Sequence, residues 1–171
     1  CTVLWSENFE DCPIHSVMII DDWYDGDAGA PAGQPDGNTW ECGDGCNSQY
    51  GLVIDDIADP VTDWNEDYAI SPCMYFDPSA DSLYVEFDLV TQDAGNDFDS
   101  WLNLAYTTDC DADLSSPDTW GDTILQTWVA EDLQCERITV DLSAILTSGA
   151  SEFRLNWWNQ SADAAPDRID N

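Results

Sequence analysis

The chain has 171 residues, of which 36 are Asp or Glu and three are basic (Arg137, Arg154 and Arg168), giving a formal net charge of -33 at pH 7. Binding to nucleic acid relies on many Lys and Arg contacts to phosphates, so this composition excludes nucleic acid as a partner. Hydrophobic residues make up 43% of the chain and include nine Trp, so the acidic residues are expected on the surface of a folded domain.

Apolar and polar residues alternate with a period of two along most of the chain, which is the pattern of half-buried strands. Near the start, Val3, Trp5 and Phe9 fall on one face. Further strands are predicted, in chain order, at 50–54, 68–71, 83–90, 101–107, 123–129, 137–142 and 152–157, with one helical turn near 142–146. This pattern predicts an all-β fold: a two-sheet antiparallel jelly-roll sandwich in a single domain spanning 1–171.

Long acidic loops separate the predicted strands. The segment 21–45 is rich in Gly, Pro and Asp, and 93–100 is rich in Asp. Two compatible interpretations explain the acid content. A dense carboxylate surface keeps a halophilic protein hydrated in brine or seawater, and carboxylates gather around calcium, which prefers oxygen ligands. The acidic loops do not match an EF-hand, so calcium ligands would come from separate segments.

Seven cysteines indicate disulfides formed in an oxidising compartment, and therefore a secreted or cell-surface protein. Zinc is the weaker interpretation, because the C-x3-C pair at 42 and 46 has no second Cys/His pair to complete a site. Because seven cysteines cannot all form pairs, either Cys1 is lipidated, or Cys1 pairs with Cys12 and another cysteine stays free. Connectivity cannot be deduced from sequence, and the pairs considered are Cys42–Cys46, Cys110–Cys135 and Cys12–Cys73.

The aromatic residues offer a candidate platform for stacking sugar rings. Trp157 and Trp158 are neighbours in one predicted strand, so one points inward and the other outward. Stacking candidates are Trp120, Trp128 and Trp158, and the alternative is that these rings pack in the core. The sequence N-Q-S at 159–161 matches the N-glycosylation sequon, a pattern that often arises by chance.

No arrangement of residues singles out a catalytic site. His15 is the only histidine, and it lies outside any G-x-S-x-G context. A glycosidase pair of carboxylates cannot be picked out among 36 acidic residues.

Six short motifs follow one another in an order that resembles a known family. They are E-N-F-E at 7–10, D-G-N-T-W at 36–40, D-Y-A-I-S-P at 67–72, S-L-Y-V-E-F-D at 82–88, V-D-L-S at 140–143 and I-D-N at 169–171. Their order resembles the MAM-like jelly rolls of the cleaved-adhesin and choice-of-anchor type in secreted bacterial proteins. The resemblance spans nearly the whole chain, although cysteines are more numerous here than in that family.

The resemblance implies a jelly roll that binds calcium and has an adhesive or accessory role without catalysis. In that family the last strand begins where this chain stops. The resemblance therefore implies a domain that lacks its last strand or belongs to a longer protein, with an open sheet edge that another chain can fill. The calcium ligands it implies are Glu7, Glu10, Asp36, Asn38, Asp67 and Asp170.

These observations lead to one main functional hypothesis: a secreted, calcium-stabilised surface module that binds or adheres to a glycan or a protein. A structural subunit of an extracellular filament or sheath, joined to copies of itself by strand donation, is the first alternative. An accessory domain of a secreted hydrolase is the second.

The net charge predicts that stability rises with salt. Repulsion between carboxylates extends about 10 Å at 0.1 M salt but about 3 Å at 1 M. In the presence of a chelator, the urea midpoint of unfolding should therefore increase as sodium chloride is raised into the molar range. A midpoint that stays constant or falls would contradict the salt-adapted interpretation of the acidic surface.

Overall fold

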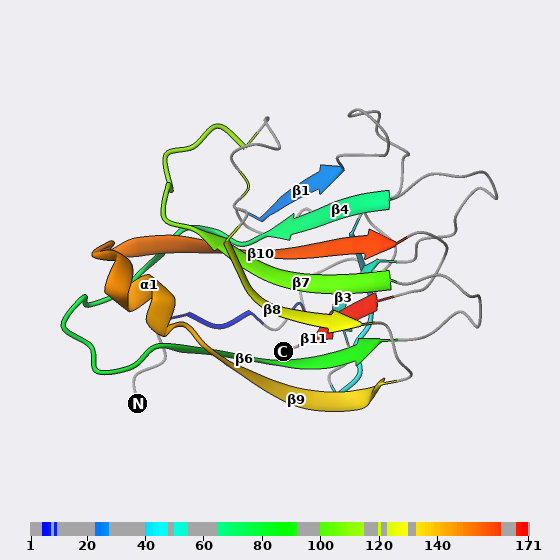
Figure 1. Ribbon diagram of the computed structural model, residues 1–171. Coiled ribbons are helices and arrows are strands. Elements are labelled where there is room, and N and C mark those ends of the chain that lie inside the picture. The colour runs from blue at the N-terminus through cyan, green and yellow to red at the C-terminus, as the bar shows by residue number, and fades with distance from the viewer. Residues whose placement is uncertain are drawn as a thin grey trace.

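The computed structural model describes residues 5–7, 9, 23–27, 40–47, 50–54, 65–91, 100–114, 120, 123–129, 133–161 and 167–170. These residues form two antiparallel sheets that pack face to face (Figure 1), which confirms the predicted all-β sandwich. The elements are β1 (Tyr24–Asp27), β2 (Glu41–Asp44), β3 (Tyr50–Ile54), β4 (Asn65–Ile70), β5 (Met74–Tyr75), β6 (Tyr84–Thr91), β7 (Ser100–Thr107), β8 (Thr123–Val129), β9 (Leu133–Asp141), α1 (Ser143–Ser148), β10 (Glu152–Ser161) and β11 (Asp167–Asp170).

The larger sheet has six strands in the order β1-β4-β10-β7-β8, and β5 pairs with the start of β10. β10 is its longest strand, because apolar Phe153, Leu155 and Trp157 alternate with polar or outward-facing residues over ten positions. It therefore forms the centre of the sheet, with β4 on one side and β7 on the other.

The smaller sheet has five strands in the order β2-β3-β11-β6-β9. β11 lies in its middle, with Asp167–Ile169 paired to β3 and Asp167–Asp170 paired to β6. The segment 167–170, expected from the resemblance to stand at an open edge, thus has a hydrogen-bonded neighbour on each side.

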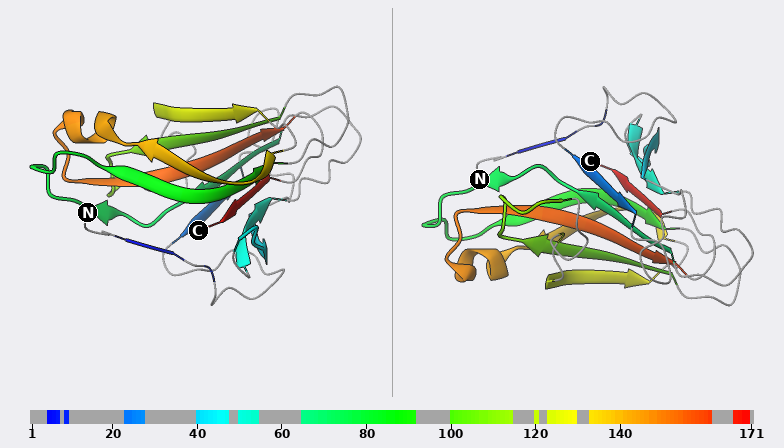
Figure 2. Two further views of the ribbon diagram at one scale, coloured as in Figure 1. Left: turned by 90° about the horizontal axis from the view of Figure 1, so that it is seen from below. Right: turned by 90° about the horizontal axis from the view of Figure 1, so that it is seen from above.

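The core lies between the two sheets, which Figure 2 shows as separate layers. A chain of aromatic contacts crosses it: Trp23 packs against Phe9 and Trp157, and Trp157 packs edge-on against Phe87. The described part of the first segment, Trp5–Glu7 and Phe9, contributes to this core without forming a strand, and Val3 lies outside the described residues.

The short helix α1 closes one end of the sandwich. Ile145 is its fully buried residue, and Gly149 ends the helix with a left-handed φ of 81°, a conformation that glycine adopts without strain. Within the described part of the chain, no helix is long and apolar enough to cross a membrane.

Two disulfides join distant segments, Cys46–Cys135 and Cys73–Cys110. The pairs Cys42–Cys46, Cys110–Cys135 and Cys12–Cys73 considered from the sequence are therefore wrong. β2 is extended through Asp44, which holds residues 42 and 46 too far apart to bond. Cys42 is also disulfide-bonded, and Cys1 and Cys12 lie outside the described residues.

The Cys46–Cys135 disulfide connects the two opposite edges of the smaller sheet. Cys46 follows β2 at one edge and Cys135 lies in β9 at the other. Four strand spacings would separate these edges by roughly 19 Å, yet the two Cα atoms are 5.6 Å apart. The tip of the β2–β3 hairpin therefore bends across the outer side of the sheet, and we call residues 45–47 with this disulfide the hairpin clasp.

An ion pair between an exposed arginine and a buried aspartate lies beside the hairpin clasp. The guanidinium of Arg137 donates two hydrogen bonds to the carboxylate of Asp88, which is fully buried beside the last residue of β11. Arg137 lowers the pKa of Asp88, and a hydrogen bond from Asn47 in the clasp acts in the same direction. The clasp and the Arg137 side chain together cover Asp88 on the outer side of β6.

Removing the hairpin clasp should destabilise the protein and loosen β11. The cross-link spans 89 residues, so the Cys46→Ser/Cys135→Ser variant should lose roughly 4–5 kcal/mol of unfolding free energy. Urea unfolding measures this loss, and hydrogen exchange should show faster opening of 167–170 than of β10. The matched control, Cys73→Ser/Cys110→Ser, should lose a comparable amount without that selective effect on β11. Equal protection of β11 in both variants would contradict the role given to the clasp.

Candidate functional site

The outer side of the larger sheet carries three cross-strand rows of residues that point away from the core. They alternate along the strands with core residues such as Ala69, Leu104 and Trp157, so strand geometry places them on the opposite face. We call this surface the aromatic–amide face. Its rows are Tyr24, Ile70, Asn156, Ala105 and Ile124; Gly26, Tyr68, Trp158, Asn103 and Thr127; and Gln160, Trp101 and Val129.

Aromatic and aliphatic side chains reach solvent on this face. Trp158 is half-buried and stacks on Tyr68, with ring centroids 5.4 Å apart and planes 13° apart. Trp101 is half-buried on the neighbouring strand β7, diagonal to Trp158. At the β8 edge, Ile124 and Val129 are 48% and 47% exposed. The face therefore offers flat apolar surfaces on three adjacent strands.

A hydrogen-bonded network of amides and a hydroxyl crosses the same three strands. The Thr127 hydroxyl on β8 donates to the Asn103 side-chain oxygen at 2.7 Å, and the Asn103 amide donates to Gln160 Oε1 at 3.3 Å. These bonds hold the polar groups in fixed orientations between Trp158 and Trp101. Such groups can exchange hydrogen bonds with the hydroxyls of a ligand.

The aromatic–amide face is nearly free of charge. No residue in the three rows is acidic. Glu66 of β4 is in register with Gln160 of the third row, and Glu152 and Arg154 lie further along β10. By contrast, charged residues face outward on the smaller sheet, among them Glu41, Glu86, Asp88, Arg137 and Asp141. In a chain with a net charge of -33, such a neutral surface favours an uncharged ligand.

Trp120 closes one side of the aromatic–amide face. Its ring is 3% exposed and packs edge-on against Tyr68 at 4.6 Å. Its Nε1 donates to the Leu114 carbonyl at 2.6 Å, and its own carbonyl accepts from the Asn156 amide at 3.1 Å. Ile70 is fully buried in this cluster. The open part of the face therefore lies over β10, β7 and β8.

Of the three tryptophans predicted to stack a ligand, the structure places one on the open face. Trp158 lies there, whereas Trp120 is buried in its own contacts and offers no free ring face. Trp128 pairs with Leu102 and packs edge-on against Phe87, so it faces the core. Trp101, which the sequence analysis did not single out, takes their place. In the sequence, Trp101 alternates with the core residues Leu102 and Leu104, and this pattern could have placed it on the outer side of the strand.

The larger sheet also has a polar row on its inner side. Asp67 of β4 lies in register between Asp27 of β1 and Asn159 of β10. Asp67 and Asn159 are fully buried, and both side-chain atoms of the Asn159 amide lack a hydrogen-bond partner among the described residues. An unsatisfied buried amide costs about 1–3 kcal/mol. The burial of Asn159 also makes the N-Q-S sequon inaccessible in the folded chain.

The other residues of the predicted calcium set are only partly placed. The Glu7 carboxylate accepts a hydrogen bond from the Phe9 backbone N–H at 2.9 Å, and Phe9 adopts a left-handed φ of 53°. Asp170 pairs through its backbone with Asp88 in the smaller sheet. Glu10, Asp36 and Asn38 lie outside the described residues. Calcium binding by these six residues therefore stays a prediction. Asp67 is fully buried.

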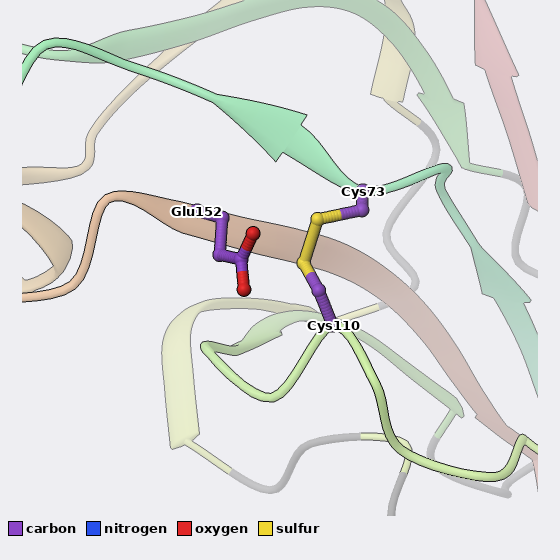
Figure 3. Close-up of side chains that lie close together, drawn as sticks. All are labelled: Cys73, Cys110 and Glu152. Carbon is purple, nitrogen blue, oxygen red and sulfur yellow. A yellow bond between two sulfur atoms is a disulfide. The ribbon is translucent and has the colours of Figure 1, made fainter.

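Cys73, Cys110 and Glu152 form another cluster of potential metal ligands, shown in Figure 3. The two sulfur atoms are bonded to each other across β10, so neither is a thiolate that could bind a metal. Arg154 Nη2 donates to the Cys110 carbonyl at 2.8 Å and fixes the same corner. The cluster is a structural cross-link at one end of the aromatic–amide face.

Comparison with known proteins identifies the fold. The chain matches the K1 cleaved adhesin domain of Lys-gingipain from Porphyromonas gingivalis W83 with a TM-score of 0.63 and 19% identity, over 96% of this chain and 92% of that chain. The K3 cleaved adhesin domain of the same protein matches with a TM-score of 0.50 and 16% identity, over 94% and 95%.

A carbohydrate-binding protein shares this fold. The structure of TmCBM61 in complex with β-1,4-galactotriose matches with a TM-score of 0.52 and 8% identity, over 95% of this chain and 90% of that chain. No family model and no curated protein sequence matches the chain. The fold is therefore a cleaved-adhesin-like jelly roll, as the order of the motifs predicted.

The packing of Trp120 over Gly26 gives a test of how the face is closed. A Cβ atom at position 26 would stand 2.6–2.8 Å from three atoms of the Trp120 ring, so Gly26→Ala should displace the ring and cost about 1–3 kcal/mol of unfolding free energy. In a Trp120→Phe background the smaller ring leaves room, and the same change should cost clearly less. Urea unfolding of the four proteins measures this coupling. Additive losses would contradict the contact.

Proposed function

We propose that this protein is an extracellular, non-catalytic binding module that recognises an uncharged glycan through the aromatic–amide face. The observation that carries this proposal is the combination on one open surface of aromatic rings, an ordered amide and hydroxyl network, and almost no charge. The rest of the chain is strongly acidic, so the composition of this face is not a reflection of the overall composition.

The chemistry of the face suits sugars. Sugar rings present apolar C–H faces that pack on aromatic rings, and Trp158 and Trp101 provide such rings on adjacent strands. Sugar hydroxyls both donate and accept hydrogen bonds, and the half-buried Gln160 amide and the exposed Thr127 hydroxyl, which the buried Asn103 amide orients, offer both kinds of partner. Uronates, sulfated sugars and phosphates would be repelled by the acidic surroundings.

Two further observations support the proposal. The disulfides Cys46–Cys135 and Cys73–Cys110 are typical of proteins that mature outside the reducing cytoplasm. The similar structures are cleaved adhesin domains and a carbohydrate-binding protein in complex with galactotriose. They support a binding role on this fold, while the residues of the face supply the argument for a neutral glycan.

Affinity electrophoresis against soluble polysaccharides tests the proposal. The panel holds neutral polymers (galactan, glucan and mannan) and anionic ones (alginate and polygalacturonate), and we expect retardation by at least one neutral polymer and by none of the anionic ones. Trp158→Ala should weaken binding about thirtyfold, because a central Trp in a binding surface typically contributes about 2 kcal/mol.

Controls on the two sheets make the result specific. Tyr84→Ala removes an aromatic ring that is 55% exposed on the smaller sheet and should leave binding unchanged. Thr127→Val keeps the shape of the side chain but removes the hydroxyl that orients Asn103, and should weaken binding by a smaller factor. Binding that responds equally to Trp158→Ala and Tyr84→Ala, or retardation by anionic polymers alone, would refute the proposal.

A further inference from the structure

We infer that two copies of this protein pair through β8, the outermost strand of the larger sheet, and form a reversible dimer with one continuous sheet. β8 ends the strand order of that sheet and pairs with β7 alone among the described strands. Figure 2 shows β8 at the margin of the molecule in both views. The inference does not rest on the glycan proposal, because strand pairing uses backbone groups at the edge of the sheet, whereas the proposed glycan site lies on its face.

The edge formed by β8 is open. Thr123, Gln126 and Thr127 are exposed. Ile124 and Val129 are 48% and 47% exposed, so no described segment covers the strand. The Thr127 carbonyl accepts a hydrogen bond from the side-chain amide of Gln126 on the same strand, at 3.4 Å. A bond of this length is weaker than the bond of about 2.9 Å that the N–H of a neighbouring strand donates. The edge therefore still offers backbone groups to another strand.

β8 differs in charge from the other strands at sheet edges. β1 reads Y-D-G-D, β2 reads E-C-G-D and β9 reads L-Q-C-E-R-I-T-V-D, so each of them carries charged side chains. Charged residues on an edge strand help to prevent it from pairing with another chain. β8 reads T-I-L-Q-T-W-V and has no charged residue, although the chain has 36 acidic residues. Of the four strands that end the two described sheets, β8 alone lacks this protection.

The lack of charge also identifies the partner. A charged strand would find no opposite charge on β8 with which to form a cross-strand pair. β8 is itself an uncharged strand rich in β-branched residues, which favour sheet pairing, so a second copy supplies a matching strand. A two-fold axis makes each β8 the partner of the other and uses both edges at once, so assembly stops at the dimer.

The dimer is expected to be weak and to form as salt is raised. A register shift beside Leu104 and Ala105 leaves residues 126–129 as the regular part of β8, so the paired segment is short and the contact is small. The two copies also repel each other, because each has a formal net charge of -33. This repulsion extends about 10 Å at 0.1 M salt but about 3 Å at 1 M.

Pairing through β8 has a consequence for binding. The two-fold axis between antiparallel neighbours is perpendicular to the sheet, so the aromatic–amide faces of the two copies point to the same side. Two such faces on one surface would bind a polymer more tightly than either face alone. This consequence rests on the proposed function, whereas the dimer does not.

Sedimentation velocity over a range of protein concentrations tests the inference, at about 0.1 M and about 1 M sodium chloride and without added divalent ions. We expect a monomer–dimer equilibrium without larger species, and a larger share of dimer at the higher salt concentration. Hydrogen exchange at low and high protein concentration should show that dimerisation protects 123–129 and leaves β1, β2 and β9 unchanged.

Gln126→Glu is the variant that tests the edge directly. The change is nearly isosteric, and each copy then brings an unpaired carboxylate to the contact. The dimer dissociation constant should therefore rise by about tenfold or more. Ala144→Glu is the matched control, because it adds the same charge at an exposed position on α1 rather than on an edge strand. It should leave the dissociation constant unchanged, and circular dichroism checks that both variants are folded.

Three results would overturn the inference: a monomer at both salt concentrations, protection of a different segment on dimerisation, or equal dissociation constants for the two variants. A monomer whose segment 123–129 gains protection from an added uncharged peptide would also overturn pairing between copies, and would identify a strand of another protein as the partner.

Discussion

Neutralising carboxylates with very few cations is the constraint on which this structure depends. Three arginines face 36 acidic residues, so most acids must remain in water and any buried carboxylate needs a dedicated partner. Asp88 has such a partner in Arg137, and the ion pair anchors the hairpin clasp on the smaller sheet. The rest of the interior is built from Trp, Leu and Phe side chains, and disulfides supply cross-links that ion pairs could not supply at this composition.

The same constraint divides the two outer surfaces of the sandwich. Strands of the smaller sheet expose acidic side chains, which keep that surface hydrated, whereas the outer rows of the larger sheet hold aromatic, amide and hydroxyl groups. Trp120 marks the boundary on the larger sheet by covering Ile70 and Tyr68 and leaving β10, β7 and β8 open. One composition therefore produces two chemically different faces because each strand alternates its side chains.

Strands with a clear alternation of apolar and polar residues could be predicted from the sequence, and strands without it could not. The residues predicted at 83–90 and 137–142 fall on β6 and β9, because period-two alternation reports burial on one side of a strand. β1, β2 and β11 read Y-D-G-D, E-C-G-D and D-R-I-D, which show little apolar alternation and form strands through their neighbours. Disulfide pairing and the exchange of Trp128 for Trp101 depend on contacts across the sheets, which spacing along the chain does not contain. For the same reason Asp67 could be named from a motif, whereas Asn159 needed the register of β10.

The hairpin clasp has a mechanical consequence for the smaller sheet. Sheets pulled at their edges normally fail when rows of hydrogen bonds between neighbouring strands open one after another. Here the edges β2 and β9 are joined by a covalent bond that bypasses the three strands between them. Tension applied between these edges is carried by sulfur atoms, and the four-residue strand β11 in the middle of the sheet is shielded from the load.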